Sequence, residues 1–264
     1  MIDIHCHLEY MANPAAVVEE AKKRGMTAIV TSVPDPADAD KMFELHEKFR
    51  HFVYLSLGFH PHEVARYSDK QVDEYIEKIR KNKDNLVAVG EAGLDYNEPN
   101  LDENRKEKQK ARFIRFVKLA EELNLPLVVH IRNNSGNESS GNAYHDIFAI
   151  LEKHKLKAVV LHCFSGSETD LKTALDRGYW ISFATNVCKT KKHPRLAAKT
   201  PLDKMLLETD APWLDPETPF GAKDLTNKPW KIEKSAEVIA NLHDTTKKHV
   251  LDVTTKNAKK VFGI

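Results

Sequence analysis

Residues 103–132 read ENRKEKQKARFIRFVKLAEELNLPLVVHIR, and this stretch holds the two patterns that predict the fold. Apolar residues recur at helical spacing as far as Leu123, and Asn124-Leu125-Pro126 ends that pattern. A short run rich in β-branched residues then follows in residues 127–132. An amphipathic helix followed by a buried strand is the repeating unit of α/β proteins with a parallel sheet.

The same alternation continues along the whole chain. Strand-like runs cover residues 2–8, 27–33, 53–60, 86–94, 127–132, 158–165, 179–185 and 205–209. Eight strands with helix-like stretches between them predict an α/β protein with a single-domain (β/α)8 TIM-type barrel. We expect one domain over residues 1–264, a length that α/β barrels commonly reach, with two helices after Pro229.

Composition excludes several classes of protein. Lys plus Arg number 40 and Asp plus Glu 39, so a net charge of +1 gives no overall attraction to nucleic acid or acidic membranes. The residues MIDIHCHLEY at the N-terminus predict no signal peptide, and no apolar run approaches the roughly 20 residues that span a bilayer. Three cysteines without a CxxC pair favour a reducing compartment. We expect a cytoplasmic protein without a membrane association or an obligatory protein partner.

The strongest chemical signal is His5-Cys6-His7 at the end of the first predicted strand. Because side chains alternate across a strand, His5 and His7 face one way and Cys6 faces the other. Two imidazoles directed into the mouth of a barrel make half of a metal site. The alternative is an ordinary pair of polar residues, which is disfavoured because branched apolar side chains fill most barrel interiors.

Four further ligand-type residues lie at the ends of later strands. Glu91 lies in VAVGEAGLDY, His130 in LVVHIR, His162 in AVVLHCFS with Cys163 expected on the opposite face, and Asp210 in MLLETDAPW. Any one of them alone would be explained as a hydrogen-bonded polar group of the core. Six such residues on five strands would bury several charges at a high cost in free energy unless a cation compensates them.

Six ligands suit two divalent metal ions (Mg, Mn or Zn) bridged by the Glu91 carboxylate. The predicted ligand sets are His5, His7, Glu91 and Asp210 for one ion and Glu91, His130 and His162 for the other. Two ions about 3.5–4 Å apart can stabilise the attacking and leaving oxygens of a displacement, and their bound water loses a proton near neutral pH. Asp210 is expected to accept that proton, so Asp210 and Glu91 are the predicted catalytic residues.

A second group of polar residues surrounds these positions. His60 and His62 belong to GFHPH at the end of the third strand, and Arg132 lies two residues beyond His130. A guanidinium there can bind a phosphate through two hydrogen bonds, so Arg132 is a predicted substrate-binding residue, and His60 and His62 offer two more imidazoles to the mouth. The alternative is a solvated rim. Glu208, two residues before Asp210, is expected either to orient a ligand histidine or to be purely structural.

Basic and aromatic residues near the mouth predict contacts with a phosphate backbone and with bases. The basic candidates are residues 189–195 (KTKKHPR), Lys199, Lys223, Lys228 and Lys231. The aromatic candidates are Trp213, Phe220 and Trp230. The alternatives are a solvated lysine-rich helix and ordinary packing of the rings.

The ordered motifs DIHCHL, GFHPH, VGEAGLDY, LPLVVHIR, VVLHCFSGS and LLETDAPWL resemble the TatD family of metal-dependent deoxyribonucleases. This resemblance covers nearly the whole chain. It implies a barrel of the amidohydrolase-like group, divalent metals bound by the six residues above, and hydrolysis of phosphodiester bonds in DNA, with 3′–5′ exonuclease action on single-stranded DNA as one form of it. His60 and His62 match the HPH motif of the family, which implies that they are substrate-binding residues. The chain departs from the family in two longer loops, at residues 133–142 and 212–229.

Two other functions remain open at this stage. One is a lactonase, phosphotriesterase or cyclic-amide hydrolase acting on a small molecule; Glu91 disfavours it, since such enzymes often bridge their metals with a modified lysine. The other is a metal-binding scaffold that only holds nucleic acid. The presence of Asp210 disfavours a scaffold, because a binding protein needs no general base.

Overall fold

The sheet at the centre of the molecule has eight parallel strands in the order β1 to β8. The computed structural model describes residues 1–99, 101–134, 141–219 and 225–264. The strands are β1 Ile2–Cys6, β2 Ala28–Val33, β3 Val53–Phe59, β4 Leu86–Asp95, β5 Leu127–Arg132, β6 Val159–Leu161, β7 Trp180–Phe183 and β8 Met205–Leu207. Backbone bonds from Asp210 N to His5 O (3.0 Å) and from His7 N to Ala211 O (2.7 Å) join the two ends of the sheet. The predicted barrel is confirmed.

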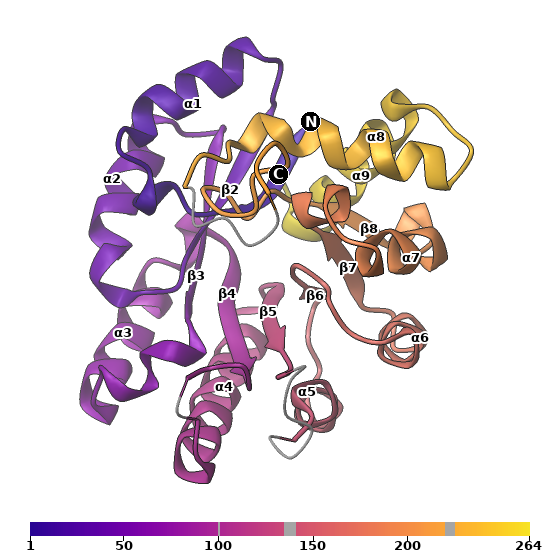
Figure 1. Ribbon diagram of the computed structural model, residues 1–264. Helices are drawn as coiled ribbons and strands as arrows, with labels where there is room; N and C mark the ends of the chain where they lie inside the picture. Colours follow the sequence, from indigo (N-terminus) through magenta and orange to yellow (C-terminus); the bar gives the residue numbers. More distant parts are fainter. Residues whose placement is uncertain (100, 135–140, 220–224) are drawn as a thin grey trace.

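Helices surround this sheet (Figure 1). They are α1 Pro14–Lys23, α2 Ala39–Lys48, α3 Asp69–Lys81, α4 Glu103–Leu123, α5 Ala143–Leu151, α6 Glu168–Asp176, α7 Lys192–Lys199, α8 Ile232–Leu242 and α9 Lys247–Phe262. Short 3-10 helices are η1 Leu8–Tyr10, η2 Pro36–Asp38, η3 Pro61–Ala65, η4 Lys83–Asn85, η6 Thr185–Cys188, η7 Leu202–Lys204 and η8 Pro229–Lys231. The two helices expected after Pro229 are α8 and α9.

Helix α4 begins and ends where the sequence predicts. The Asp102 carboxylate accepts a hydrogen bond from Arg105 N at 2.7 Å, which satisfies one of the free N–H groups of the first turn. At the other end Asn124 adopts a left-handed conformation (φ 52°), and Pro126 follows. A polar cap and a left-handed stop are local signals, so they can be read without knowledge of the tertiary structure.

Several strands are shorter than predicted, and this changes the direction of one side chain. β6 ends at Leu161, so His162 and Cys163 lie beyond it, and Cys163 has a positive φ of 44°. Strand alternation therefore no longer applies, and both side chains line one cavity. The expectation that Cys163 faces away from His162 is wrong. For β1 the expectation holds: Cys6 packs in the outer core, with Sγ 4.0 Å from Val30 O.

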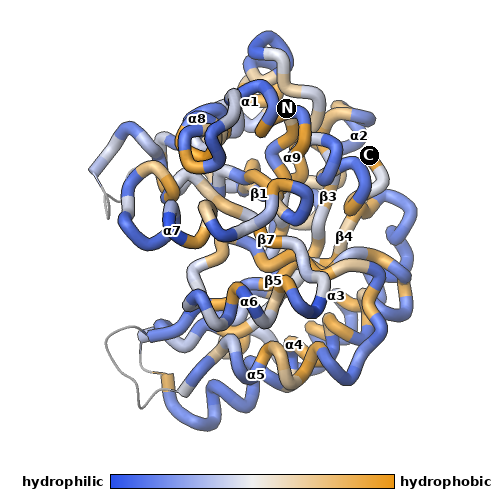
Figure 2. Tube along the Cα trace, turned by 90° about the vertical axis from the view of Figure 1, so that its right-hand side faces the viewer, coloured by the Kyte–Doolittle hydropathy of each residue, from blue (hydrophilic) through white to orange (hydrophobic). Residues whose placement is uncertain are grey.

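Apolar side chains form two clusters, one outside and one inside the barrel. The larger lies between the strands and the helices, and the strands run through the apolar centre of the molecule in Figure 2. The smaller occupies the barrel interior and includes Val128, which shares a face of β5 with His130, and Val160 of β6. Val261 and Phe262 of α9 pack on this inner cluster. One end of the barrel is thus sealed by apolar residues, and the polar residues occupy the other end.

Two bulk features accompany this fold. Within the described residues, none of the helices combines the length and hydrophobicity that crossing a bilayer requires. All three cysteines are free thiols.

Candidate active site

The six predicted ligand residues converge at the carboxyl ends of the strands. A cavity of about 430 Å³ opens there, and five of the six line it, namely His7, Glu91, His130, His162 and Asp210. His5 lies directly behind, with its Nε2 3.2 Å from Nε2 of His7. Except for His130 and Asp210, which are partly exposed, these side chains are buried. The residues come from five strand ends, as the sequence predicts.

The Glu91 carboxylate separates these residues into two groups. Its Oε2 lies 3.3 Å from Nε2 of His5 and 3.7 Å from Nε2 of His7. Asp210 Oδ1 completes this group, 3.4 Å from Nε2 of His7. The other carboxylate oxygen of Glu91, Oε1, faces the second group, 2.5 Å from Nδ1 of His130 and 3.1 Å from Nε2 of His162. One carboxylate therefore offers one oxygen to each predicted ligand set, which is the arrangement that a bridging ligand requires.

His60 lies closer to the metal-type groups than the sequence suggests. Its Nε2 is 3.9 Å from Glu91 Oε1, and His60, Glu91 and His130 offer ligand atoms within 4.8 Å of one another. His62 lies further out, with its side chain 41% exposed and its Nε2 3.0 Å from Asp95 Oδ2. Arg132 is exposed at the cavity rim. The three predicted substrate-binding residues all line this cavity.

Three histidines of the site are hydrogen-bonded, through a ring nitrogen, to a carboxylate that lies behind them. Glu9 Oε1 lies 3.0 Å from Nδ1 of His7, and Glu208 Oε1 lies 3.0 Å from Nδ1 of His162. Asp95 Oδ2 lies 3.2 Å from Nε2 of His130. Carboxylates in this position set the tautomer and the ring orientation of a metal-binding histidine. The sequence points to Glu208, whereas Glu9 and Asp95 are missed.

Two simple signals would have revealed the missed carboxylates. Glu9 lies two residues after His7, and Asp95 lies four residues after Glu91 on the same face of β4. A third missed residue is Asp3, which is fully buried and accepts bonds from Thr209 N (3.0 Å) and Thr209 Oγ1 (2.5 Å). It connects β1 to the segment after β8, where Asp210 lies. Nothing in the local sequence pairs Asp3 with Thr209.

Electrostatics favour a cation at this site. Burial works against protonation of His7, but Glu9 and Asp210 outweigh it and raise the pKa of His7 to about 10. Asp95 and Glu91 likewise overcome burial and raise the pKa of His130 to about 9. Burial opposes ionisation of Glu91, yet the His162 charge and hydrogen bonds from its three histidine neighbours hold its pKa well below the usual range. The cluster therefore carries negative charge that protons or metal cations must balance.

The chemistry of this donor set fits divalent cations. Imidazole nitrogens and carboxylate oxygens are ligands that Zn, Mn and Mg accept. His5, His7 and Asp210 form one group whose ligand atoms lie within 4.8 Å of one another, and His5, His162 and Glu208 form another. The membership of Glu208 in such a group was not expected from the sequence. Its carboxylate is also bonded by Cys163 N (2.6 Å) and Ser182 Oγ (2.7 Å), which suits a supporting position.

The predicted basic patch is only partly formed. Lys199 pairs with Glu168, and Lys231 pairs with Asp215 and Glu217, so their charges are neutralised. Lys192, by contrast, borders a groove beside the cavity. Lys223 lies outside the described residues, as does the aromatic candidate Phe220.

Of the two remaining aromatic candidates, one lies at the site. Trp213 lines the cavity, with its ring 5.1 Å from those of His7 and Tyr10. Trp230 instead packs under the Arg24 guanidinium, 4.8 Å from its ring centroid. For Trp230 the structure favours the packing alternative, because that ring already contacts a side chain of the helical layer.

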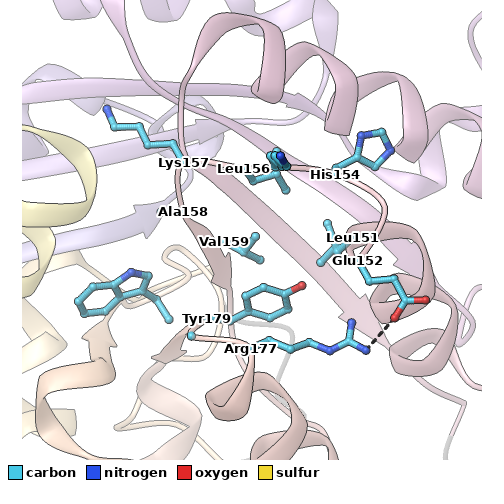
Figure 3. A pocket seen from close by; sticks show the side chains of 12 residues that line it. Leu151, Glu152, His154, Leu156, Lys157, Ala158, Val159, Arg177 and Tyr179 are labelled. Carbon is cyan, nitrogen blue, oxygen red and sulfur yellow. Dashed lines mark hydrogen bonds and ion pairs between the residues drawn. The ribbon is translucent and has the colours of Figure 1, made fainter.

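A second hollow of about 680 Å³ lies at the amino ends of β6 and β7 (Figure 3). Two of its polar side chains already have partners: Arg177 pairs with Glu152 at 3.1 Å, and His154 pairs with Glu121 at 2.8 Å. Among the described residues, no group of possible metal ligands lies here. In barrel enzymes this end serves stability and the opposite end serves chemistry. The candidate site is therefore the cavity around Glu91.

Comparison with known proteins agrees with the motif pattern. A family model described as TatD related DNase matches residues 2–263. The human protein named Deoxyribonuclease TATDN3 is 32% identical over 273 residues, an alignment that covers 99% of this chain and 94% of the human protein. The chain belongs to the TatD-related DNase family. The resemblance seen in the sequence is thereby confirmed.

Other TatD proteins extend this comparison. A Pantoea ananatis protein named 3′-5′ ssDNA/RNA exonuclease TatD is 28% identical, and the alignment covers 100% of both chains. The solved structure of YJJV, a TatD homologue from Escherichia coli K12, superposes with a TM-score of 0.86 at 24% identity and covers 100% of this chain and 98% of that one. This structural likeness concerns the fold alone, and it agrees with the (β/α)8 architecture.

Proposed function

We propose that this TatD-family chain hydrolyses phosphodiester bonds of single-stranded DNA, as a 3′–5′ exonuclease that uses two divalent cations, Mg, Mn or Zn. The observation that carries the proposal is the position of Glu91, whose two oxygens face separate groups of ligand-type residues at 2.5–3.7 Å. Bound there, two cations would supply an activated water and positive charge beside the phosphate. His5, His7, Glu91, His130, His162 and Asp210 are the proposed ligands.

The chain's own residues supply the remaining functions. Asp210 is 19% exposed and faces the cavity, so its carboxylate is placed to accept a proton from the attacking water. Burial opposes its ionisation, but His7 and His162 hold its pKa below the usual range, which keeps it ready as an acceptor. Arg132, whose guanidinium forms no ion pair among the described residues, is proposed to bind the phosphate.

The first experiment combines metal analysis with cleavage of labelled single-stranded DNA in Mg, Mn and Zn. We expect two metals per chain and stepwise shortening of the strand from its 3′ end. Asp210→Asn should lower kcat by about 10²–10⁴-fold, the usual contribution of a general base, while DNA affinity stays close to that of the wild type. Asp203→Asn, on the exposed η7, is the matched control and should cleave normally.

Two results would contradict the proposal. One is a protein that binds metal at neutral pH but leaves single-stranded DNA intact while it hydrolyses small esters or lactones, because that result would make it a small-molecule hydrolase. The other is an Asp210→Asn variant with unchanged turnover, which would remove Asp210 from the mechanism. Metal content of the variant must be measured as well, since Asp210 is also a proposed ligand.

A further inference from the structure

Three hollows meet at the mouth of the barrel, and Arg132 borders all of them. The first is the cavity around Glu91. The second, of about 270 Å³, adjoins it and shares His130, His162 and Asp210 with it. The third, of about 810 Å³, continues outward and shares His193 and Ser165 with the second. These shared linings make one path from the candidate metal centre across the carboxyl end of the barrel, between β5 and α7.

The outer part of this path is cationic and polar. Lys192 lines it, and within the described ranges its Nζ donates only to the backbone carbonyl of Ser165. Among the described residues, no carboxylate lies within ion-pair distance of Lys192 or of Arg132. Asp170 is also in the lining, but its Oδ2 accepts bonds from Ser167 N (2.8 Å) and Ser167 Oγ (2.7 Å). Within the part of the chain that the structure describes, Arg132 and Lys192 are therefore two cations of this path that have no ion-pair partner.

Polar side chains brace the wall of this path. Asn133 Oδ1 accepts from Ala143 N at 2.7 Å, and Asn133 Nδ2 donates to Asn142 Oδ1 at 3.2 Å. Asn142 Oδ1 also accepts from Tyr144 N at 3.0 Å at the start of α5. A wall held by several hydrogen bonds keeps its shape when a ligand binds, so less conformational entropy is lost.

The opposite side of the cavity differs in charge and shape. Tyr10 and Trp213 form an aromatic wall, with ring centroids 5.1 Å apart. Beyond it, Asp35 and Glu63 line the cavity and share one guanidinium, that of Arg66. Two carboxylates with one cation repel phosphate, whereas an aromatic ring accepts a base.

We infer that a single-stranded DNA chain enters along the path from Lys192 to Arg132, and that the wall formed by Tyr10, Trp213, Asp35 and Glu63 admits only the terminal nucleoside. This inference rests on the proposed nuclease function. It assigns Lys192 to a phosphate upstream of the scissile bond. It also gives a physical reason for cleavage at strand ends: a chain that continued past the wall would place its next phosphate against Asp35 and Glu63.

The path should make binding depend on strand length. The test measures anisotropy of fluorescent oligodeoxynucleotides of two to eight nucleotides with the metal-free protein in EDTA, so that binding is followed without cleavage. Affinity should rise with length for the wild type. Lys192→Ala should weaken binding of the longer strands roughly three- to tenfold, and should lower the dependence of log affinity on log salt by about 0.7. Dinucleotide binding should stay unchanged.

Lys157→Ala is the matched control, because it removes one lysine at the other end of the barrel. Length-independent binding, or equal effects of both substitutions, would overturn the path whether or not the protein cleaves DNA. A different result is a protein whose binding depends on strand length and is weakened by Lys192→Ala, but which cleaves no DNA with any metal. That result would support the path and contradict the proposed nuclease function.

Circular strands and end-modified strands test the wall. In Mg or Mn, linear single-stranded DNA should be cleaved at least tenfold faster than a circle of the same sequence. A phosphate on the 3′ end of the linear strand should slow its cleavage. Glu63→Gln should relieve that effect of the 3′ phosphate, because it removes one repelling charge. A circle cut as fast as the linear strand would overturn the wall.

Discussion

At the scale of single residues, the carboxylates behind the histidines decide how the site is held. Glu208 is fully buried and receives bonds from His162 Nδ1 (3.0 Å), Cys163 N (2.6 Å) and Ser182 Oγ (2.7 Å). It comes from the end of β8, while His162 follows β6. A single side chain thus connects the second proposed ligand set to the strand that leads to Asp210.

Glu208→Gln should weaken metal binding about 10–100-fold, because the amide keeps the shape of the carboxylate but loses its charge toward His162. Titration of the apo-protein with Zn or Mn, followed by calorimetry, measures the change. Glu47→Gln, an exposed α2 residue paired with Arg50, is the control and should bind metal normally. Equal metal affinity in both variants would leave Glu208 with a structural role only.

At the scale of elements, β4 and β5 approach so closely that Gly93 has no room for a side chain. Gly93 lies opposite His130 in the parallel register, and a Cβ on Gly93 would lie 1.8 Å from the His130 carbonyl oxygen. A backbone atom cannot move away as a flexible side chain can, so the strands themselves would have to separate. The position of His130 at the metal site therefore depends on a glycine of the neighbouring strand.

Gly93→Ala should destabilise the protein by about 3 kcal/mol or more, since it forces a methyl group against rigid backbone, and should also disturb metal binding at His130. Gly25→Ala is a suitable comparison: φ is +77° there, yet no atom lies within 4 Å of an added Cβ. Gly25→Ala should lower the free energy of unfolding by only about 1–2 kcal/mol, because alanine is strained in the left-handed conformation. Urea unfolding of both variants measures the difference, and equal losses would contradict the close approach.

At the scale of the whole molecule, the two ends of the barrel have separate tasks. Phe262 and Val261 of α9 pack on the inner apolar cluster at one end, and the polar site occupies the other. His193, in the first turn of α7, is 8% exposed, and among the described residues its ring nitrogens bond only to Thr190 (2.6 Å) and Asn186 (3.2 Å). A buried neutral imidazole makes the stability of the fold depend on pH.

Burial, with a smaller contribution from Lys192, lowers the pKa of His193 to about 4. The unfolded chain binds this proton near pH 6.5, so the contribution of His193 to stability is complete above pH 6.5 and is lost as pH falls toward 4. Between pH 7.5 and 5 the free energy of unfolding should drop by about 2 kcal/mol from this residue. Denaturant unfolding in EDTA at both pH values should show a smaller decrease in the free energy of unfolding for His193→Gln than for the wild type. An equal decrease in both proteins would refute the assignment of this pH dependence to His193.

Much of this protein could be predicted from local patterns. The ends of α4 depend on Asp102 and Asn124, and these caps act within a few residues of themselves. The ligand-type residues could be found because imidazole and carboxylate groups stand out in apolar strands such as LVVHIR. Cys163 shows the limit: its predicted direction relied on strand alternation, and β6 ends two residues earlier.

Local sequence patterns were enough to predict the alternation of strands and helices, to single out six candidate ligands and to reveal the resemblance to TatD proteins; the six are His5, His7, Glu91, His130, His162 and Asp210. These features follow from side-chain type and from periodicity, which act over short distances. Three other features came from the folded barrel: Glu91 turns one oxygen to each group, Arg132 borders three hollows, and Lys199 and Lys231 have carboxylate partners. Among the described residues, Lys192 has no such partner. Those outcomes depend on pairs of residues far apart in the chain, whose distances are set only when the barrel closes.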